Sequence, residues 1–257
     1  MIRAENLFKS FGEVEVIKGI SLTFQPGKTN LIIGRSGAGK TVMLKMLVGL
    51  IKPSDGKVFY NDTDFYSLSK QATREIRMKV GMLFQGSALF DSLTVEENVR
   101  FPLDMFTSMT KGEKQKRVDY CLDRVNLTGS NDKFPSEVSG GMQKRVGIAR
   151  AIVLEPKYLF ADEPNSGLDP KTSLVIDELI RSITIENKMT TVINTHDMNS
   201  VLEIGDSIAL LKNGYLVWTG SKEEVLTSSD ENINDFIFAS PFLKKIRDQS
   251  FDPGERL

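Results

Sequence analysis

One eight-residue stretch constrains the fold of this chain more than any other feature: Gly34-Arg35-Ser36-Gly37-Ala38-Gly39-Lys40-Thr41. It matches the pattern G-x-x-x-x-G-K-[S/T] in full. The apolar residues 30–33 before it predict a buried strand, and residues 40–50 after it predict a helix that Pro53 stops. A loop between a strand and a helix start directs backbone N–H groups at phosphate oxygens. The sequence therefore predicts a nucleotide site in an α/β fold.

The residues of this loop have different expected roles. The glycines let the backbone wrap closely around phosphate groups. We expect Lys40 to reach the β- and γ-phosphates of ATP, and the Thr41 hydroxyl to bind Mg²⁺. All eight residues are therefore candidate nucleotide contacts, and the alternative is a glycine-rich turn that matches the pattern by chance.

Two consecutive carboxylates, Asp162 and Glu163, follow the apolar residues 158–161. A buried strand there would deliver Asp162 beside the Mg²⁺ ion as a ligand, and Glu163 would orient and deprotonate the attacking water. Carboxylates at the end of a strand can also form a solvated turn. The phosphate-binding loop upstream favours the catalytic interpretation.

Three further side chains are predicted to join this site. His196, the only histidine, follows a predicted strand at 190–194 and is expected to sense the γ-phosphate. Gln85 follows a predicted strand at 80–84, from which it could reach Mg²⁺ or the attacking water. Phe11 could stack on the adenine ring. The alternatives are a structural or merely exposed histidine at 196 and ordinary core packing for Phe11.

A second phosphate site is predicted far along the chain, where Ser139, Gly140 and Gly141 open a helix. Small residues at a helix N-terminus form an anion site for the same reason as the first loop. One fold does not need two such sites, but a dimer does, because each subunit could cap the γ-phosphate that the other holds. The alternative is an ordinary serine N-cap.

The α/β pattern is interrupted by a helical stretch. Residues 2–7 and 16–24 read as β segments, and helix caps at Thr94 and Thr110 begin a helical insert at about 86–155. Strands and helices then alternate again, with a helix at 170–187 and a hairpin turn at 213–214. The predicted fold class is α/β, a mainly parallel sheet with an antiparallel β subdomain and an inserted α-helical subdomain.

Composition excludes several classes of protein. The net charge of −1 gives no sign of a nucleic-acid binder, and the basic clusters at 111–117 and 144–145 are interpreted as solvated helix faces. A single cysteine, Cys121, lies on an apolar stripe and is predicted to be buried, which suits a reducing cytosol. No apolar run is long enough to span a membrane, and the N-terminus does not resemble a signal peptide.

Taken in order, these motifs resemble those of the ABC transporter ATPases over about residues 2–220. The order is an aromatic A-loop (Phe11), Walker A (34–41), Q-loop (Gln85), signature (139–143), Walker B (158–163), D-loop (166–169) and H-loop (His196). The resemblance implies a P-loop NTPase (RecA-like) domain that uses ATP and Mg²⁺. It also implies a dimer with a second copy of the chain, in which ATP lies between the Walker A loop of one subunit and the signature of the other.

The same resemblance implies an integral-membrane permease as partner. The chain would then be cytoplasmic and peripheral on the cytoplasmic face of the inner membrane, attached through that permease. A helical tail at 221–257 would follow the ATPase domain. Its apolar residues are predicted to pack on the chain's own domain, or alternatively on a second subunit or a regulator; they are Phe236, Ile237, Phe238, Phe242 and Leu243.

A narrower resemblance lies in residues 82–95, 98–102 and 139–142, which are similar to the Mce/Mla-type phospholipid transport ATPases. That group implies an Mce-type lipid-binding protein as a further partner, with phospholipid moving between the membranes of diderm bacteria. Three residues depart from the general family pattern, since Phe11 replaces a tyrosine, Val138 a leucine and Met142 a glutamine. None of them removes a catalytic group, and Met142 fits the lipid-transport branch.

Three other functions stay open. The ATPase of a small-solute ABC importer would have the same site chemistry, so only the permease-facing stretch 86–106 discriminates it. A soluble ABC ATPase acting on nucleic acid or ribosomes usually fuses two ATPase units or carries long inserts, whereas this chain has one unit and no basic arm. A nucleotide-binding regulator without hydrolysis is disfavoured by Asp162, Glu163 and His196.

Overall fold

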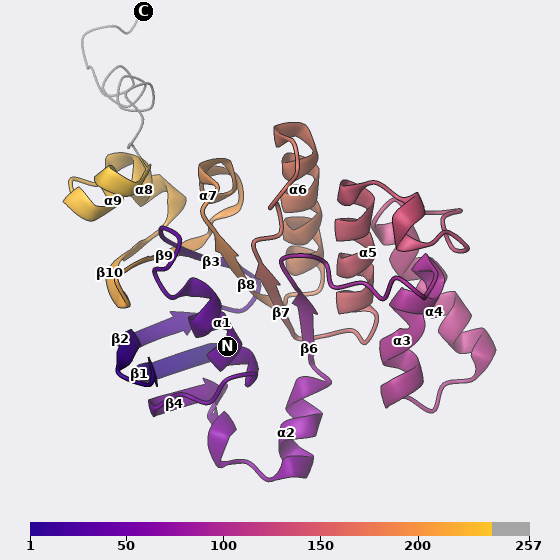
Figure 1. Ribbon diagram of the computed structural model, residues 1–257, viewed down its shortest axis with the longest axis horizontal. Helices are drawn as coiled ribbons and strands as arrows, with labels where there is room; N and C mark the ends of the chain where they lie inside the picture. The colour runs from indigo at the N-terminus through magenta and orange to yellow at the C-terminus, as the bar shows by residue number, and fades with distance from the viewer. Residues whose placement is uncertain (238–257) are drawn as a thin grey trace, which may run out of the picture.

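A six-stranded sheet forms the centre of the molecule (Figure 1). The structure is a computed structural model and describes residues 1–237. The strand order is β10-β9-β3-β8-β7-β6, in which the last five run parallel and β10 pairs antiparallel with β9. The strands are β3 (Thr29–Ile33), β6 (Val80–Leu83), β7 (Tyr158–Asp162), β8 (Thr190–Thr195), β9 (Ser207–Lys212) and β10 (Tyr215–Gly220). The mainly parallel sheet and the hairpin at 213–214 that the sequence predicts are confirmed.

Successive residues of the central strands face two different hydrophobic cores. Leu31 and Ile33 of β3 lie in one core, whereas Ile32 between them lies in the other. In β7 the same division separates Leu159 from Phe160. Side chains of a strand alternate between its two faces. The continuous apolar runs in the sequence therefore correspond to strands that are covered on both sides.

Helices cover one face of the central sheet, and a helix with a second sheet covers the other (Figure 1). The first face packs against α6 (Pro170–Glu186) and α7 (Met198–Ile204), together with α5 (Gly140–Ile152). The second face packs against α1 (Lys40–Val48). The sequence patterns predict neither α7 nor α2 (Lys70–Arg77), because helices of 7 and 8 residues are shorter than the window of about 11 residues over which a helical period is read.

The antiparallel subdomain is a four-stranded sheet in the order β2-β1-β4-β5. Its strands are β1 (Ile2–Phe11), β2 (Val14–Phe24), β4 (Asp55–Tyr60) and β5 (Thr63–Asp64), followed by the short 3-10 helix η1 (Phe65–Ser67). The first two strands are longer than predicted, because they stay paired up to the turn between Phe11 and Val14. The predicted antiparallel subdomain is confirmed.

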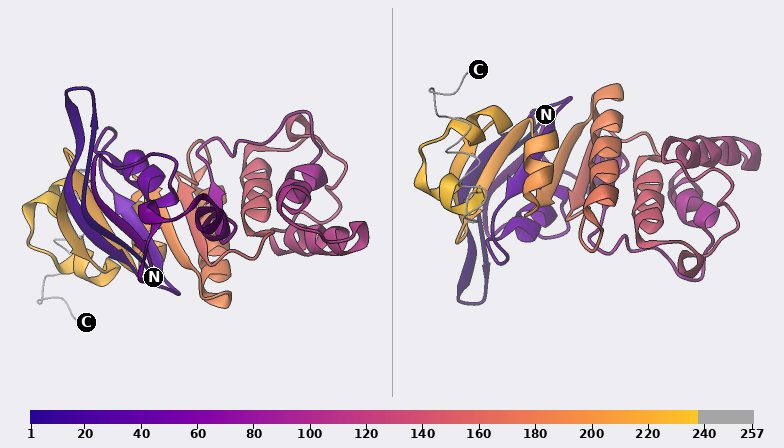
Figure 2. Two further views of the ribbon diagram at one scale, coloured as in Figure 1. Left: turned by 90° about the horizontal axis from the view of Figure 1, so that it is seen from below. Right: turned by 90° about the horizontal axis from the view of Figure 1, so that it is seen from above.

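The helical insert stands as a separate group beside the sheets in both views of Figure 2. It contains α3 (Val95–Phe106), α4 (Lys111–Arg124), the 3-10 helix η2 (Pro135–Glu137) and α5 (Gly140–Ile152). Capping boxes are present at Thr94 and Thr110, as the sequence predicts. Cys121 is buried as predicted, and burial raises the pKa of its thiol to about 11.

The described part of the tail packs on the chain's own core. It forms α8 (Lys222–Thr227) and α9 (Glu231–Ile237), which lie beside α7 and β10 (Figure 1). Val225, Ile233 and Ile237 are buried in the same hydrophobic core as α6 and α7. This part of the tail therefore packs on the chain's own domain, and not on a second subunit or a regulator. Phe238, Phe242 and Leu243 lie outside the described residues.

Candidate active site

Most of the predicted site residues meet at one edge of the central sheet. Strands β3, β8, β7 and β6 are neighbours and run parallel, so their carboxyl ends lie together. The phosphate-binding loop follows β3, His196 follows β8, Glu163 follows β7, and Gln85 comes shortly after β6. Ligands of open α/β sheets bind at this edge. The topology thus explains why residues far apart in the sequence converge.

The phosphate-binding loop wraps around the start of α1. Gly39, the N-cap of this helix, has φ +100°, and a Cβ there would lie 2.7 Å from the Ile17 side chain. Only glycine accepts both this conformation and this contact. Arg35, Ser36 and Gly37 are exposed, whereas Lys40 is buried and donates from Nζ to the carbonyl oxygen of Gly34 at 2.8 Å.

Asp162 is held by two side chains at the end of β7. The Thr41 hydroxyl donates to Asp162 Oδ1 at 3.1 Å, and Asn194 Nδ2 on β8 donates to the same oxygen at 3.0 Å. Asp162 and Asn194 are register partners of the two strands. The Thr41 hydroxyl and the carboxylate therefore converge on one point. Hydroxyl and carboxylate oxygens are ligands that Mg²⁺ prefers, so these two residues fit a magnesium ion that accompanies a nucleotide.

Glu163 bridges Lys40 and His196. Its Oε1 lies 3.6 Å from Lys40 Nζ, and its Oε2 lies 2.7 Å from His196 Nδ1. The residue adopts a left-handed conformation with φ +50°, and its backbone N–H donates to the Asn194 carbonyl at 3.0 Å. A non-glycine residue in this region stores strain, which is typical of functional sites. A carboxylate in this place can accept a proton from a water above the lysine.

A cavity of about 590 Å³ joins these residues. All of the phosphate-binding loop except Gly34 lines it, together with Gln85, Glu163 and His196. The Gln85 backbone carbonyl accepts a hydrogen bond from Lys144 of α5, which ties the start of the helical insert to this cavity. Lys144 is buried, so the prediction of a solvated helix face is wrong for this residue.

Gly34 and Asp162 do not line this cavity, and two further predicted contacts, Phe11 and the signature at 139–141, also lie outside it. Phe11 is 48% exposed at the end of β1, next to Lys9, so the core-packing alternative is wrong and the adenine contact stays a prediction. Ser139 and Gly140 are exposed at the start of α5, where Ser139 Oγ accepts from the Met142 N–H at 3.3 Å. None of these residues lines the cavity that contains Lys40.

Sequence reasoning missed four residues of the site. Asn194 donates to Asp162, and Lys144 donates to the Gln85 carbonyl. Val16 of β2 and Phe236 of α9 line the cavity. The apolar strand at 190–194 could have revealed Asn194, because a polar side chain inside a buried strand needs a partner. The other three carry no signal, since only the tertiary fold brings β2, α5 and α9 to the loop.

The fold and this edge of the sheet define the class of the protein as a P-loop NTPase. A family model described as ABC transporter matches residues 17–166, which is more than half of the chain. The chain therefore belongs to the ABC transporter family and carries its ATPase domain. Within the described residues, no helix is both long enough and apolar enough to cross a membrane.

Curated relatives carry transport names. The probable ribonucleotide transport ATP-binding protein mkl of Mycobacterium tuberculosis is 38% identical over 236 residues, which are 92% of this chain and 66% of that protein. The methionine import ATP-binding protein MetN of Rhodopseudomonas palustris is 41% identical over 86% of this chain and 59% of that protein. The chain thus spans slightly less than two thirds of the length of these relatives.

Solved structures agree on the fold. A dimeric structure of the ATP-binding cassette MJ0796, bound to ADP and Pi, is 33% identical with a TM-score of 0.79, and it covers 86% of this chain and 99% of that one. The cbiO1 protein of Clostridium perfringens, part of an ABC transporter complex named cbiONQ, is 28% identical with a TM-score of 0.82 over 97% and 98% of the two chains.

Proposed function

We propose that this chain is the ATP-hydrolysing subunit of an ABC transporter that moves phospholipid. The observation that carries the ATPase part is the position of Glu163, in contact with both Lys40 and His196 at the mouth of the phosphate-binding loop. On binding ATP, Lys40 would turn from its carbonyl and carboxylate contacts to the β- and γ-phosphates. Glu163 would then orient and deprotonate the attacking water, and His196 would hold the Glu163 carboxylate in place.

The metal site of this proposal uses the chain's own oxygen ligands. Thr41 and Asp162 would hold Mg²⁺, and Gln85, which lines the same cavity as Thr41, would join them. The bound ion would neutralise charge on the phosphate oxygens. Asn194 keeps the Asp162 carboxylate aimed at Thr41, because it donates to the same oxygen.

The signature residues would complete the site of a second copy. Ser139 and Gly140 are exposed, and a Cβ on Gly140 would meet only the tip of Leu168, at 3.9 Å. The chain's own packing therefore does not require glycine at this position, whereas close approach by an outside group does. Gly141 differs, since a Cβ there would lie 2.7 Å from Thr172. A head-to-tail dimer would bring the exposed helix start of α5 to the partner's γ-phosphate.

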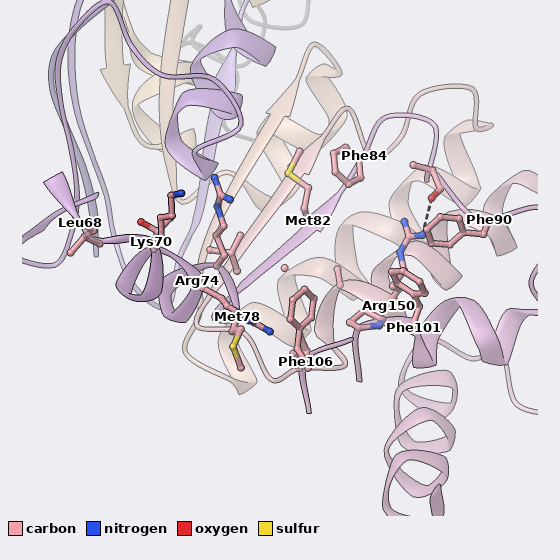
Figure 3. A pocket seen from close by; sticks show the side chains of 18 residues that line it. Leu68, Lys70, Arg74, Met78, Met82, Phe84, Phe90, Phe101, Phe106 and Arg150 are labelled. Atoms are coloured by element: carbon pink, nitrogen blue, oxygen red, sulfur yellow. Dashed lines mark hydrogen bonds between the residues drawn. The ribbon is translucent and has the colours of Figure 1, made fainter. Parts of the chain in front are cut away.

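A groove between the two halves of the chain is the proposed permease site. It has a volume of about 1010 Å³ and lies where α2 and β6 of the core face α3 and α5 of the insert (Figure 3). Four exposed phenylalanines line it, namely Phe84, Phe90, Phe101 and Phe106. Exposed apolar surface of this kind is typical of protein–protein contact sites.

Hydrogen bonds hold one wall of this groove in shape. Arg150 of α5, which Figure 3 labels, donates to the carbonyl oxygens of Ser87 and Ala88 at 2.5 and 2.8 Å. These bonds fix two residues of positive φ just after Gln85. Asn98 is fully buried, and it bonds both the N–H and the carbonyl of Phe90. Movement of a permease segment in the groove would therefore shift the loop that carries Gln85.

The narrower assignment, phospholipid as cargo, rests on the likeness of residues 82–95 and 139–142 to the Mce/Mla-type ATPases. In that case an Mce-type lipid-binding protein would be a further partner, and the chain would lie at the cytoplasmic face of the inner membrane. The second candidate is the ATPase of a small-solute importer. It is favoured by the names of the relatives, which refer to methionine import and ribonucleotide transport.

Isolation of the tagged full chain with its partners from its native membrane tests both candidates. Phospholipid transport predicts an integral-membrane permease, an Mce-type protein and bound phospholipid in the purified complex. A permease with a solute-binding protein and no lipid carrier would overturn the lipid assignment and support the importer. An untagged strain controls for lipid and protein that adhere without specific binding.

A further inference from the structure

A buried polar cluster links two loops of the site and is not used by the mechanism above. It consists of three side chains from three segments: Asn165 in the loop after β7, Asp177 in α6 and Ser200 in α7. Ser200 Oγ donates to Asp177 Oδ2 at 2.7 Å, and Asn165 Nδ2 donates to Ser200 Oγ at 3.0 Å. Their exposed fractions are 8%, 1% and 1% in the same order, so water does not compete for these bonds.

The cluster ties together the chain segments that carry the catalytic candidates. Asn165 comes two residues after Glu163 and directly before the exposed Ser166 and Gly167. Ser200 comes four residues after His196, on the short helix that Asp197 caps. Ser200 bonds the Asp177 carboxylate of α6, a long helix of 17 residues, and the loop of Asn165 is bonded to that helix through Ser200. The positions of both loops are therefore set relative to one helix, α6.

Apolar packing alone does not explain this arrangement. Burying polar groups costs free energy unless they are bonded, and Asn165 Oδ1 and Asp177 Oδ1 have no hydrogen-bond partner among the described residues. Burial raises the pKa of Asp177 to about 6, and the nearby Asp197 and Glu203 add to the rise. A costly polar cluster beside the site points to a positional role, because an apolar trio would stabilise the fold better.

We propose that Asn165, Asp177 and Ser200 form a clasp that positions Glu163 and the loop 166–169 relative to His196 during ATP hydrolysis. The three are positioning residues, because none of them lines the cavity that contains Lys40. The clasp rests on the proposed ATPase function. Loss of the Ser200 hydroxyl would let the two loops move independently, which lowers turnover without removing any contact to bound ATP.

The test compares the full-length Ser200→Ala and Asp177→Leu variants with a matched control, Thr184→Ala. Thr184 also lies on α6 with a buried hydroxyl, which bonds Thr191 Oγ1 at 2.6 Å at the start of β8, the end away from the site. We expect kcat to fall about tenfold or more in the first two, with KM for ATP within about twofold of wild type. The control should lose thermal stability but keep its kcat.

Asp177→Asn is the conservative variant, since its amide can still accept from Ser200. We expect it to recover most of the lost kcat. Unchanged kcat in Ser200→Ala, a parallel rise in KM, or an Asp177→Asn variant as slow as Asp177→Leu would each overturn the clasp. A wild-type protein without ATPase activity would instead overturn the proposed ATPase function. An active wild type whose ATPase activity is lost in the Glu163→Gln variant would support that function, independently of the clasp.

Discussion

The nucleotide cavity and the groove beside α2 and α3 share the same sheet but are built in opposite ways. The cavity depends on a few polar atoms, since Lys40, Glu163 and His196 form one chain of contacts of 3.6 and 2.7 Å. The groove instead exposes aromatic rings, such as Phe90 and Phe101, whose centroids lie 4.8 Å apart. The cavity is therefore suited to one chemical step, and the groove to recognition of a surface by shape.

This difference predicts opposite responses to substitution. A substitution in the cavity that replaces a single polar atom of a side chain removes the reacting group without changing the fold. In the groove, one side chain contributes only part of a large apolar surface, so chemistry should survive while association fails. The following variants test whether the two regions separate in this way.

The largest effect is expected for Glu163→Gln. The amide cannot take a proton from water, so ATP turnover should fall by about 10²–10⁴-fold, the usual contribution of a general base. ATP binding should persist, because Lys40 and the loop backbone are unchanged, and the variant should be trapped as a closed dimer. Steady-state ATPase assays and light scattering with ATP measure the two effects. Turnover near the wild-type rate would remove Glu163 as the base.

Ser139→Arg tests whether the cavity of one copy of the chain is completed by the signature of a second copy. If the signature completes the partner's site, a bulky side chain there should lower turnover about 100-fold, comparable to the loss of one stabilising donor. Binding of a fluorescent ATP analogue should be nearly unchanged, since Ser139 does not line the cavity of its own chain. Ser136→Arg, at another exposed position, is the control. Normal turnover in Ser139→Arg would exclude a composite site.

Sequence reasoning identifies the cavity well, because its residues come directly after buried strands. The pattern from 34 to 41 and the pair Asp162-Glu163 each carry their own context, namely an apolar strand followed by a loop. Parallel strands then bring these loops to one edge, so local pattern and topology agree. The two-sheet architecture and the helical insert follow from the same strand and cap signals.

The groove and the supporting contacts could not be predicted in the same way. Lys144 reads as one member of an exposed basic pair, yet the fold buries it against the Gln85 carbonyl. Phe236 lines the cavity only because α9 packs beside β10. Short helices such as α2, which forms one wall of the groove, are shorter than the window of about 11 residues over which a helical period is read. Long-range packing decides the first two cases, and helix length the third.

Phe101→Asp tests the groove side of the comparison. Phe101 is 37% exposed in the groove wall, so a charge there should not disturb folding but should repel an apolar partner surface. Basal ATPase should stay within about twofold of wild type, whereas permease recovered with the tagged chain should fall about tenfold or more. Ile185→Asp places the same charge on an exposed apolar residue of α6 outside the groove and should retain the permease. Equal recovery in both variants would contradict the docking site.

The smallest effect is expected for Asn98→Ala, which acts on the groove through stability. Asn98 accepts from the Phe90 N–H at 2.8 Å and donates to the Phe90, Leu93 and Thr94 carbonyls at 3.0 Å each. Its loss takes the side-chain partner from the Phe90 N–H and the Leu93 carbonyl in a partly buried place, whereas the Phe90 and Thr94 carbonyls keep backbone donors. The free energy of unfolding should therefore fall by about 2 kcal/mol. Asn187→Ala, which removes one partly buried bond at the end of α6, should cost less. Urea unfolding measures both, and equal losses would show that Asn98 does not hold the loop. Basal ATPase of folded Asn98→Ala should stay close to wild type, because the Lys40–Glu163–His196 contacts do not pass through α3.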